Sequence, residues 1–330
     1  MEYSPLQLAD SCLDREKVEM IPTRDGYGKG LVQAGEKDER VVVLCADLTE
    51  STRSLWFKEK FPERFIELGV AEQNMATVAA GMANYGKIPF ISSYAAFSPG
   101  RNNEQIRTTI SLNNLPVKIA GAHAGVSVGP DGATHQALED IALMRVQPNM
   151  VVVVPCDALE AQKATFETAF NGKPTYIRLG REKSPVITRL DSPFSIGKAN
   201  ILRASEKKDV AIIGCGILLH EALIAAEELS KEGVECVVVN CHTIKPIDSE
   251  LIVSVAKDTG AVVTVEEHQI AGGLGSAIAE VLAQNYPVPQ EFVGMRDRFG
   301  ESGTAQELIK AFGLGSESIK AAVKKAISRK

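Results

Sequence analysis

The chain has 330 residues, of which 45% are hydrophobic and 24% are charged, so it is long enough for a sizeable core. Its formal net charge of −6, with no basic run, argues against a nucleic-acid-binding surface. Apolar runs such as 150–154 are far too short to span a bilayer, and the acidic N-terminus lacks a signal-peptide core. This length predicts two domains.

From residue 40 onward, strand-like apolar runs alternate with helix-like segments. Strands are predicted at 40–48, 88–94, 116–123, 149–157 and 174–180, and helices at 69–86, 102–114, 135–146 and 158–171. Uninterrupted β-branched runs between helices predict parallel strands that are covered on both faces. Such sheets bind ligands at the carboxyl ends of their strands.

Residues 181–207 are polar, proline-containing and irregular, and they predict a linker. The alternation then resumes, with strands predicted at 209–216, 234–241 and 261–268 and helices at 220–233, 248–260 and 275–286. We therefore expect two doubly wound α/β domains, residues 1–190 and 191–330.

The predicted helix 69–86 carries a single acid, Glu72, near its beginning. The other residues are mostly small and apolar, so we expect the helix to be buried with little exposed face. A glutamate in a first turn stabilises the positive end of the helix dipole. A buried carboxylate also needs a partner, because its pKa otherwise rises.

A glycine-rich loop with the sequence G-P-D-G-A-T-H-Q begins at Gly129. His135 is expected at the start of the helix that follows, and His123 at the end of the preceding strand. Two imidazoles at the ligand-binding end of a sheet suit hydrogen bonding to a substrate oxygen, or proton transfer.

Four isolated basic residues are predicted near strand or helix ends: Arg24, Arg101, Arg178 and Arg181. Each suits either an ion pair or a bidentate grip on a phosphate, and the sequence leaves both interpretations open.

Two glycine motifs and six cysteines have simple structural interpretations. G-C-G at 214–216 lacks the third glycine of a dinucleotide-binding loop, since Leu219 stands there, and A-G-G-L-G-S at 271–276 predicts helix packing. The scattered cysteines show no C-x-x-C pair and predict reduced thiols in a cytoplasmic protein: Cys12, Cys45, Cys156, Cys215, Cys236 and Cys241.

Several separated motifs together resemble the C-terminal half of transketolases. In order, they read RVVVLCADLTEST, FIELGVAEQNMATVAAGMA, FISSYAAF, SVGPDGATHQALEDIALMR and YIRLGRE, with VEEHQIAGGLGSAIAEVL further on. The resemblance is strong over 23–181 and looser beyond. It implies a pyrimidine-binding domain for thiamine diphosphate, followed by a transketolase C-terminal domain.

The resemblance also implies roles for cofactor-side residues. Glu72 matches the acid that hydrogen-bonds the cofactor's aminopyrimidine and favours the tautomer that deprotonates the thiazolium carbon. Tyr94 and Phe97 match the aromatic pair that holds this ring, although many relatives have Phe where Tyr94 stands. Asp47 matches a further carboxylate on the cofactor side.

On the substrate side, His123 and His135 match histidines that bond the donor's oxygens and assist proton transfer. The other matches are Asp131, which would read a substrate hydroxyl, and the residues that would hold the sugar phosphate, namely Arg24, Ser51 and Arg181. Ala124–Gly125 stand where full-length transketolases commonly have Asp-Ser.

The magnesium motif of the family, G-D-G with a later asparagine, does not occur in this sequence. The resemblance therefore implies that a separate N-terminal subunit binds Mg²⁺ and the diphosphate, in an α₂β₂ heterotetramer. The implied reaction transfers a two-carbon ketol unit from a ketose phosphate to an aldose phosphate. Three alternatives stay open: a deoxyxylulose-phosphate synthase or 2-oxoacid dehydrogenase β-type subunit, a non-catalytic subunit, and a nicotinamide dehydrogenase.

Overall fold

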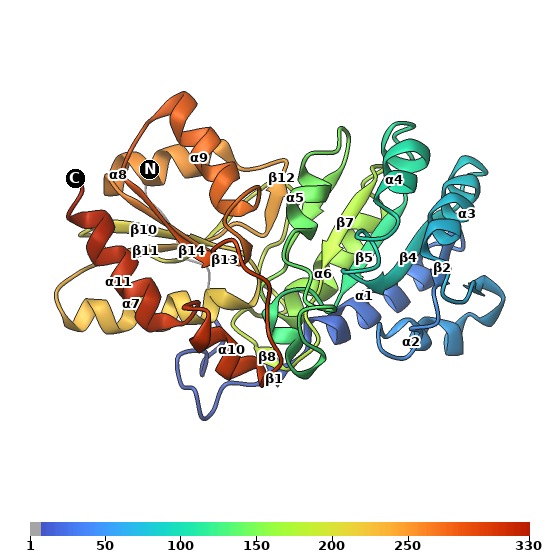
Figure 1. Ribbon diagram of the computed structural model, residues 1–330, viewed down its shortest axis with the longest axis horizontal. Helices are drawn as coiled ribbons and strands as arrows, with labels where there is room; N and C mark the ends of the chain where they lie inside the picture. The colour runs from blue at the N-terminus through green and yellow to red at the C-terminus, as the bar shows by residue number, and fades with distance from the viewer. Residues whose placement is uncertain (1–7) are drawn as a thin grey trace.

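The computed structural model describes residues 8–330 and divides into two α/β halves that lie side by side (Figure 1). The first half is built on a seven-stranded sheet. Its strands, in spatial order, are β12 (Thr243–Lys245), β6 (Val151–Val153), β7 (Thr175–Arg178), β5 (Lys118–Ala122), β4 (Ile88–Tyr94), β2 (Val41–Cys45) and β3 (Phe65–Glu67). All neighbours in this sheet are parallel except β12 and β6.

Helices cover both faces of this sheet, as the apolar strand runs predict. They are α1 (Thr23–Lys37), α2 (Ser54–Lys60), α3 (Glu72–Asn84), α4 (Asn103–Gln105) with a π-helical extension (Ile106–Ser111), α5 (Asp140–Arg145) and α6 (Ala158–Ala169). On one face, α1 packs through the fully buried Tyr27 and Leu31 against Phe90 of β4. On the other face, Met75 of α3 joins a second core with Ile119 of β5.

The second half holds a five-stranded sheet. Its order is β14 (Gln290–Met295), β13 (Val262–Gln269), β10 (Val210–Gly214), β11 (Cys236–Asn240) and β9 (Asn200–Arg203), with β9 antiparallel to β11. Its helices are α7 (Leu219–Lys231), α8 (Ser249–Thr259), α9 (Leu274–Asn285), α10 (Ala305–Ala311) and α11 (Ser316–Ile327). The core beneath α3 continues through Ile252 and Ile278, so the halves share apolar packing.

Secondary structure in the predicted linker corrects the expectation of an irregular 181–207 segment. Ser184–Pro185 forms β8, which pairs with β1 (Met20–Ile21), and β9 also lies within the segment. In addition, β12 belongs in sequence to the second half but pairs with the first sheet. Local patterns do not reveal these short strands because they are stabilised by a distant partner.

Two helix predictions in the first half are also wrong in part. The helix expected at 135–146 begins only at Asp140, so His135 lies in a turn before it. The helix α3 has an exposed face formed by uncharged residues, which are Gln73, Asn74, Thr77, Gly81 and Asn84. The expectation of a fully buried helix fails because small polar residues occupy that face at helical spacing.

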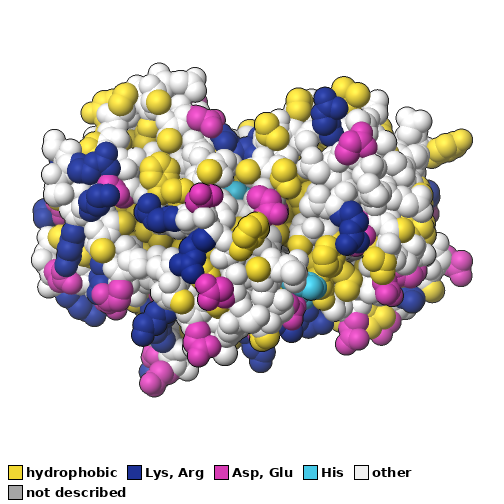
Figure 2. All heavy atoms as spheres, viewed as in Figure 1, with side chains coloured by type: hydrophobic (Ala, Val, Ile, Leu, Met, Phe, Trp, Pro, Cys, Tyr) yellow, Lys and Arg dark blue, Asp and Glu magenta, His cyan; other side chains and the backbone are white. Residues whose placement is uncertain are grey.

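Other general expectations agree with the structure. All six cysteines are buried and free. Across residues 8–330, every helix is too short or too polar to traverse a bilayer. Figure 2 shows Lys and Arg side chains interspersed with Asp and Glu over one face of the molecule, with a notch between the two halves.

Close packing of α1 on α6 makes Gly30 sensitive to substitution. A Cβ at Gly30 would lie 2.5 Å from the Gln162 carbonyl oxygen, so Gly30→Ala is expected to lower the free energy of unfolding by about 1–3 kcal/mol. Gly81, in α3, has no atom within 4 Å of such a Cβ. Gly81→Ala is therefore expected to raise stability by about 0.5–1 kcal/mol. Urea unfolding measures both, and equal effects at the two sites would contradict this packing.

Candidate functional site

The predicted site residues lie at the carboxyl edge of the seven-stranded sheet. Because β2, β4, β5 and β7 are mutually parallel neighbours, the loops that follow them meet at one edge. These loops cover residues 46–53, 95–102, 123–139 and 179–183.

Glu72 is the first residue of α3, and its side chain is only 1% exposed. Its Oε2 accepts a hydrogen bond from Arg101 Nη1 at 2.8 Å, and its Oε1 accepts one from Ser93 Oγ at 3.2 Å. The partner that a buried carboxylate requires is therefore Arg101, which sequence patterns alone leave unassigned. The pair joins residues 29 positions apart, so only the fold reveals it.

Asn102 fixes the loop that carries Arg101. Its buried Nδ2 donates to the Glu72 carbonyl oxygen and to Ser98 Oγ, each at 3.1 Å. The beginning of α3 and the loop after β4 are thereby held together around the carboxylate.

An aromatic cluster lies beside this carboxylate. Tyr94 stacks on Phe97 with ring centroids 5.9 Å apart and on His123 at 3.9 Å. His135 meets the Phe97 ring edge-on at 5.5 Å. Arg101 links the two groups, since its guanidinium carbon lies 4.9 Å from the Phe97 ring centroid. Four predicted site residues are thus in one set of contacts.

His123 follows β5 in a left-handed conformation with φ of 55° and is 1% exposed. Burial, reinforced by the positive charges of Arg24 and Arg181, lowers the pKa of His123 to about 3. His123 is therefore a neutral imidazole at physiological pH, and its buried Nδ1 is unpartnered within the described residues.

Because its pKa is lowered in the folded state, His123 is expected to make the folded chain less stable as the pH falls. In the unfolded chain its pKa returns to the ordinary 6.5, so the unfolded state binds more protons between pH 6.5 and 3. The stability that neutral His123 contributes is full above pH 6.5 and falls as pH falls. His123→Gln is expected to reduce the loss of unfolding free energy between pH 7 and pH 5 by about 2 kcal/mol. Denaturant titrations at both pH values measure this, and an unchanged difference would contradict the assignment.

Two arginines flank the histidines. Arg24 Nη1 donates to the Ser51 carbonyl oxygen at 2.8 Å, which joins α1 to the loop after β2. Arg181 Nη1 donates to the Val128 carbonyl oxygen at 2.9 Å and lies 3.9 Å from Asp131. Both side chains therefore touch loops that carry other predicted site residues.

Asp47 lies at the exposed end of the same edge. Its backbone amide donates to Glu67 Oε1 at 2.8 Å, and Glu67 also binds Thr49 Oγ1 at 2.7 Å and the Gly69 amide at 3.0 Å. Within the described part of the chain, the Asp47 carboxylate makes no hydrogen bond or ion pair to the other predicted site residues. Glu67, which the sequence motifs did not single out, instead sets the shape of this loop.

Residues of the second half contact the loop 123–139, which carries His123 and His135 and is called the histidine loop below. The Glu267 carboxylate accepts hydrogen bonds from the backbone amide and hydroxyl of Ser127. The Glu267 carbonyl oxygen accepts one from Arg178 Nη2 at 2.8 Å, and Arg178 Nε donates to Asp140 Oδ2 at 2.7 Å. Arg178 is thus a structural ion-pair residue at the junction of the halves, which decides between the two interpretations left open by the sequence.

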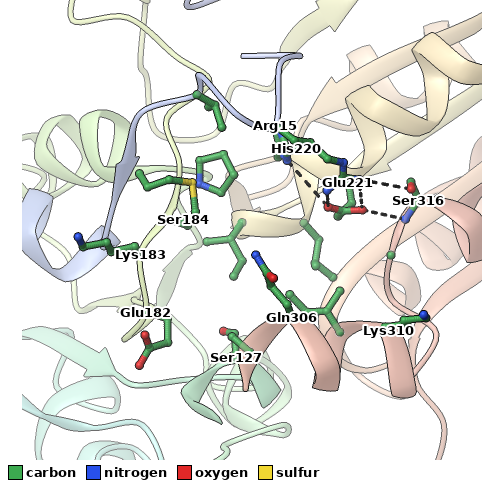
Figure 3. Close-up of a pocket in the computed structure, with 18 of the residues that line it drawn as sticks. Arg15, Ser127, Glu182, Lys183, Ser184, His220, Glu221, Gln306, Lys310 and Ser316 are labelled. Carbon is green, nitrogen blue, oxygen red and sulfur yellow. Dashed lines mark hydrogen bonds and ion pairs between the residues drawn. The ribbon is translucent and has the colours of Figure 1, made fainter. Parts of the chain in front are cut away.

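A cavity of about 530 Å³ lies apart from the predicted site residues, none of which lines it (Figure 3). Arg15 binds Glu221 through two hydrogen bonds at one wall, and Ser316 closes the same network. Ser127 and Glu182 lie on the opposite side of the cavity (Figure 3). The cavity therefore reaches the histidine loop at Ser127 and does not reach the aromatic cluster.

Comparison with known proteins assigns both halves. Residues 19–186 match the model of the transketolase pyrimidine-binding domain, and residues 197–319 match that of the transketolase C-terminal domain. Subunit SqwH of the 6-deoxy-6-sulfo-D-fructose transketolase of Clostridium sp. (strain MSTE9) is 41% identical over 314 residues, which cover 95% of this chain and 97% of that protein.

Two further relatives show which part of a transketolase the chain represents. Homo sapiens transketolase is 38% identical over 312 residues, which cover 94% of this chain but 49% of that protein. A solved structure described as a split gene transketolase, inactive beta4 tetramer, is 49% identical with a TM-score of 0.88 and is covered over 99% of its length. The expected fold and family are confirmed: the chain belongs to the transketolase family, as a subunit that corresponds to the C-terminal half of a full-length transketolase.

Proposed function

We propose that this chain is the C-terminal subunit of a two-chain transketolase that moves a two-carbon ketol unit from a ketose phosphate to an aldose phosphate. The observation that carries the proposal is the buried Glu72 carboxylate, which lies next to the aromatic cluster in a chain of the family's split type. We propose a domain boundary near residue 190, between the segments matched by the two family models.

We propose that this chain binds the pyrimidine end of thiamine diphosphate. A planar group with N–H donors already occupies the space between Glu72 and Phe97, namely the Arg101 guanidinium. His123 adds an unpartnered buried nitrogen nearby. We propose that Glu72 binds the aminopyrimidine, with Tyr94 and Phe97 along its faces and edges and Asp47 farther out on the cofactor side.

When bound, thiamine diphosphate supplies a carbon nucleophile that attacks a ketose carbonyl. The role of Glu72 is to hold or release a proton at the pyrimidine nitrogen while its own burial keeps water away. We propose that neutral His123, together with His135, hydrogen-bonds the oxygens of the sugar and assists proton transfer at them.

We propose that the distal end of the sugar binds a group of cationic and polar side chains, called the rim, which consists of Arg24, Ser51, Asp131 and Arg181. Arg24 and Arg181 would hold the phosphate with Ser51, and Asp131 would accept a hydrogen bond from a sugar hydroxyl. Support comes from the contacts that join Arg24 to the Ser51 backbone and bring Arg181 within 3.9 Å of Asp131. The same rim suits a sulfonate, the anionic group in the substrate for which the relative SqwH is named.

We propose that a separate N-terminal subunit binds the diphosphate and Mg²⁺ in an α₂β₂ assembly. The sequence lacks a G-D-G motif, and a homologous structure is described as a split gene transketolase, inactive beta4 tetramer. Buried free thiols suit a reducing compartment, and we therefore propose that the enzyme acts in the cytoplasm.

An activity assay of the isolated complex tests this function. The chain is purified from its native cell with its bound partner, and the complex is assayed with thiamine diphosphate and Mg²⁺ for ketol transfer from xylulose 5-phosphate to an aldose phosphate. The chain alone is the control and is expected to be inactive. A 6-deoxy-6-sulfo-D-fructose donor tests the sulfonate alternative at the rim.

Several results would overturn the proposal. Ketol transfer or tight cofactor binding by the chain alone would remove the need for a partner. Consumption of pyruvate with release of CO₂ would indicate a deoxyxylulose-phosphate synthase or 2-oxoacid dehydrogenase instead. A complex that transfers no ketol unit from any donor would indicate a non-catalytic subunit.

A further inference from the structure

The Arg101 guanidinium makes two contacts at the centre of the site. Its Nη1 donates to Glu72 Oε2 at 2.8 Å, and its central carbon lies 4.9 Å from the Phe97 ring centroid. One planar, delocalised cation thus bonds the buried carboxylate and covers an aromatic ring at the same time.

These are the contacts that the proposed function assigns to the aminopyrimidine. That ring would also be planar, would donate N–H to Glu72 and would lie against Phe97. The guanidinium and the pyrimidine would therefore compete for the same carboxylate and the same ring. A carboxylate 1% exposed is costly to leave unpaired, which explains why the free subunit keeps Arg101 in place.

We propose that Arg101 is an internal ligand that fills the pyrimidine site of this subunit until thiamine diphosphate displaces it. The inference rests on the proposed function, because it uses the same site. Arg101 is then a gatekeeping residue that sets cofactor affinity, in addition to the catalytic role proposed for Glu72.

The structure favours rotation of the Arg101 side chain over movement of its loop. The Arg101 amide donates to the Phe97 carbonyl oxygen at 2.9 Å, and the buried Asn102 side chain ties the next residue to Glu72. The Arg101 side chain, in contrast, is 46% exposed. Its long flexible stem allows the charge to turn into water without disturbing this backbone.

Displacement lowers apparent affinity in proportion to the time that Arg101 occupies the site. If the side chain fills the site nine-tenths of the time, the apparent dissociation constant is raised about ten-fold. Arg101→Gln keeps a polar side chain but removes the charge and the planar fork. It is therefore expected to bind thiamine diphosphate about ten-fold more tightly than the wild type in the two-chain complex.

Calorimetric titration of the complex with thiamine diphosphate and Mg²⁺ measures this affinity. Arg107→Gln is the matched control, because Arg107 is an exposed arginine on the same segment, and its affinity is expected to be unchanged. Equal or weaker binding by Arg101→Gln would overturn the proposal, since it would make Arg101 a structural ion pair or a cofactor-holding residue.

A double-mutant cycle on the full chain alone gives a second readout. Glu72→Gln and Arg101→Gln are expected to change the unfolding equilibrium constant non-additively, by about five-fold, because each removes the same ion pair. Additive effects would overturn the internal-ligand proposal. If every variant, Arg107→Gln included, fails to bind the cofactor in the complex, the proposed function fails and the inference fails with it. If all bind but Arg101→Gln gains nothing, the inference alone fails.

Discussion

Glu72→Gln is expected to lower the turnover of the assembled enzyme by about 10²–10⁴-fold while the chain stays folded. Glutamine has nearly the same shape, but Ser93 and Arg101 donate to different oxygens of the carboxylate. Its single amide oxygen can keep the hydrogen bond from Arg101, whereas its NH2 group can only donate, toward the Ser93 hydroxyl oxygen. Glutamine has no carboxylate to fill the proposed role of holding or releasing a proton at the pyrimidine nitrogen. Glu72→Ala is expected to lose activity at least as severely, because it would also remove the proposed contact with the cofactor.

Turnover with saturating thiamine diphosphate measures the effect, and circular dichroism checks the fold. Glu104→Gln is the matched control, because Glu104 is an exposed acid on the neighbouring segment and is expected to keep full activity. Near-normal turnover of Glu72→Gln in the complex would refute the catalytic role of the carboxylate. A crystal of the complex with Glu72 directed away from the pyrimidine would refute it independently.

Asp140→Asn is expected to lower the free energy of unfolding by about 3–5 kcal/mol, the largest stability change predicted for this chain. Asp140 accepts hydrogen bonds from Tyr176 at 2.6 Å and from Arg178 at 2.7 Å, and all three residues are buried. Burial alone would raise the pKa of Asp140, but the charge of Arg178 holds that pKa below its ordinary value. Asparagine would leave the guanidinium buried without its counter-charge.

Because the pKa of Asp140 is lowered in the folded state, its contribution is full at neutral pH and is lost as pH falls through that pKa. Urea unfolding at pH 7 measures the loss. Asp191→Asn is the control, because Asp191 pairs with Arg189 at the exposed surface, and no measurable change is expected. The combination of Asp140→Leu with Arg178→Met is expected to recover much of the stability. An Asp140→Asn variant as stable as the wild type would contradict the importance of this junction.

Much of the first half could be predicted from the sequence because its information is local. Uninterrupted β-branched runs predict buried parallel strands, and β2, β4 and β5 form where they were expected. Strand geometry places the two histidines at the carboxyl end of a strand, and the resemblance to transketolases adds Tyr94 and Phe97. In the structure these four side chains are in contact. Glu72 also stands out in the local sequence, because it is the only acid in a helix of small, mostly apolar residues.

The α/β class and the sheet edge that carries the candidate site follow from the amino-acid sequence alone. Which charged side chains meet depends on the three-dimensional packing. The pairs Arg101–Glu72 and Arg178–Asp140 join residues 29 and 38 positions apart, and β12 crosses from the second half to the first sheet. Periodicity in a sequence reports which face of an element is buried, whereas a long-range ion pair depends on how whole elements pack.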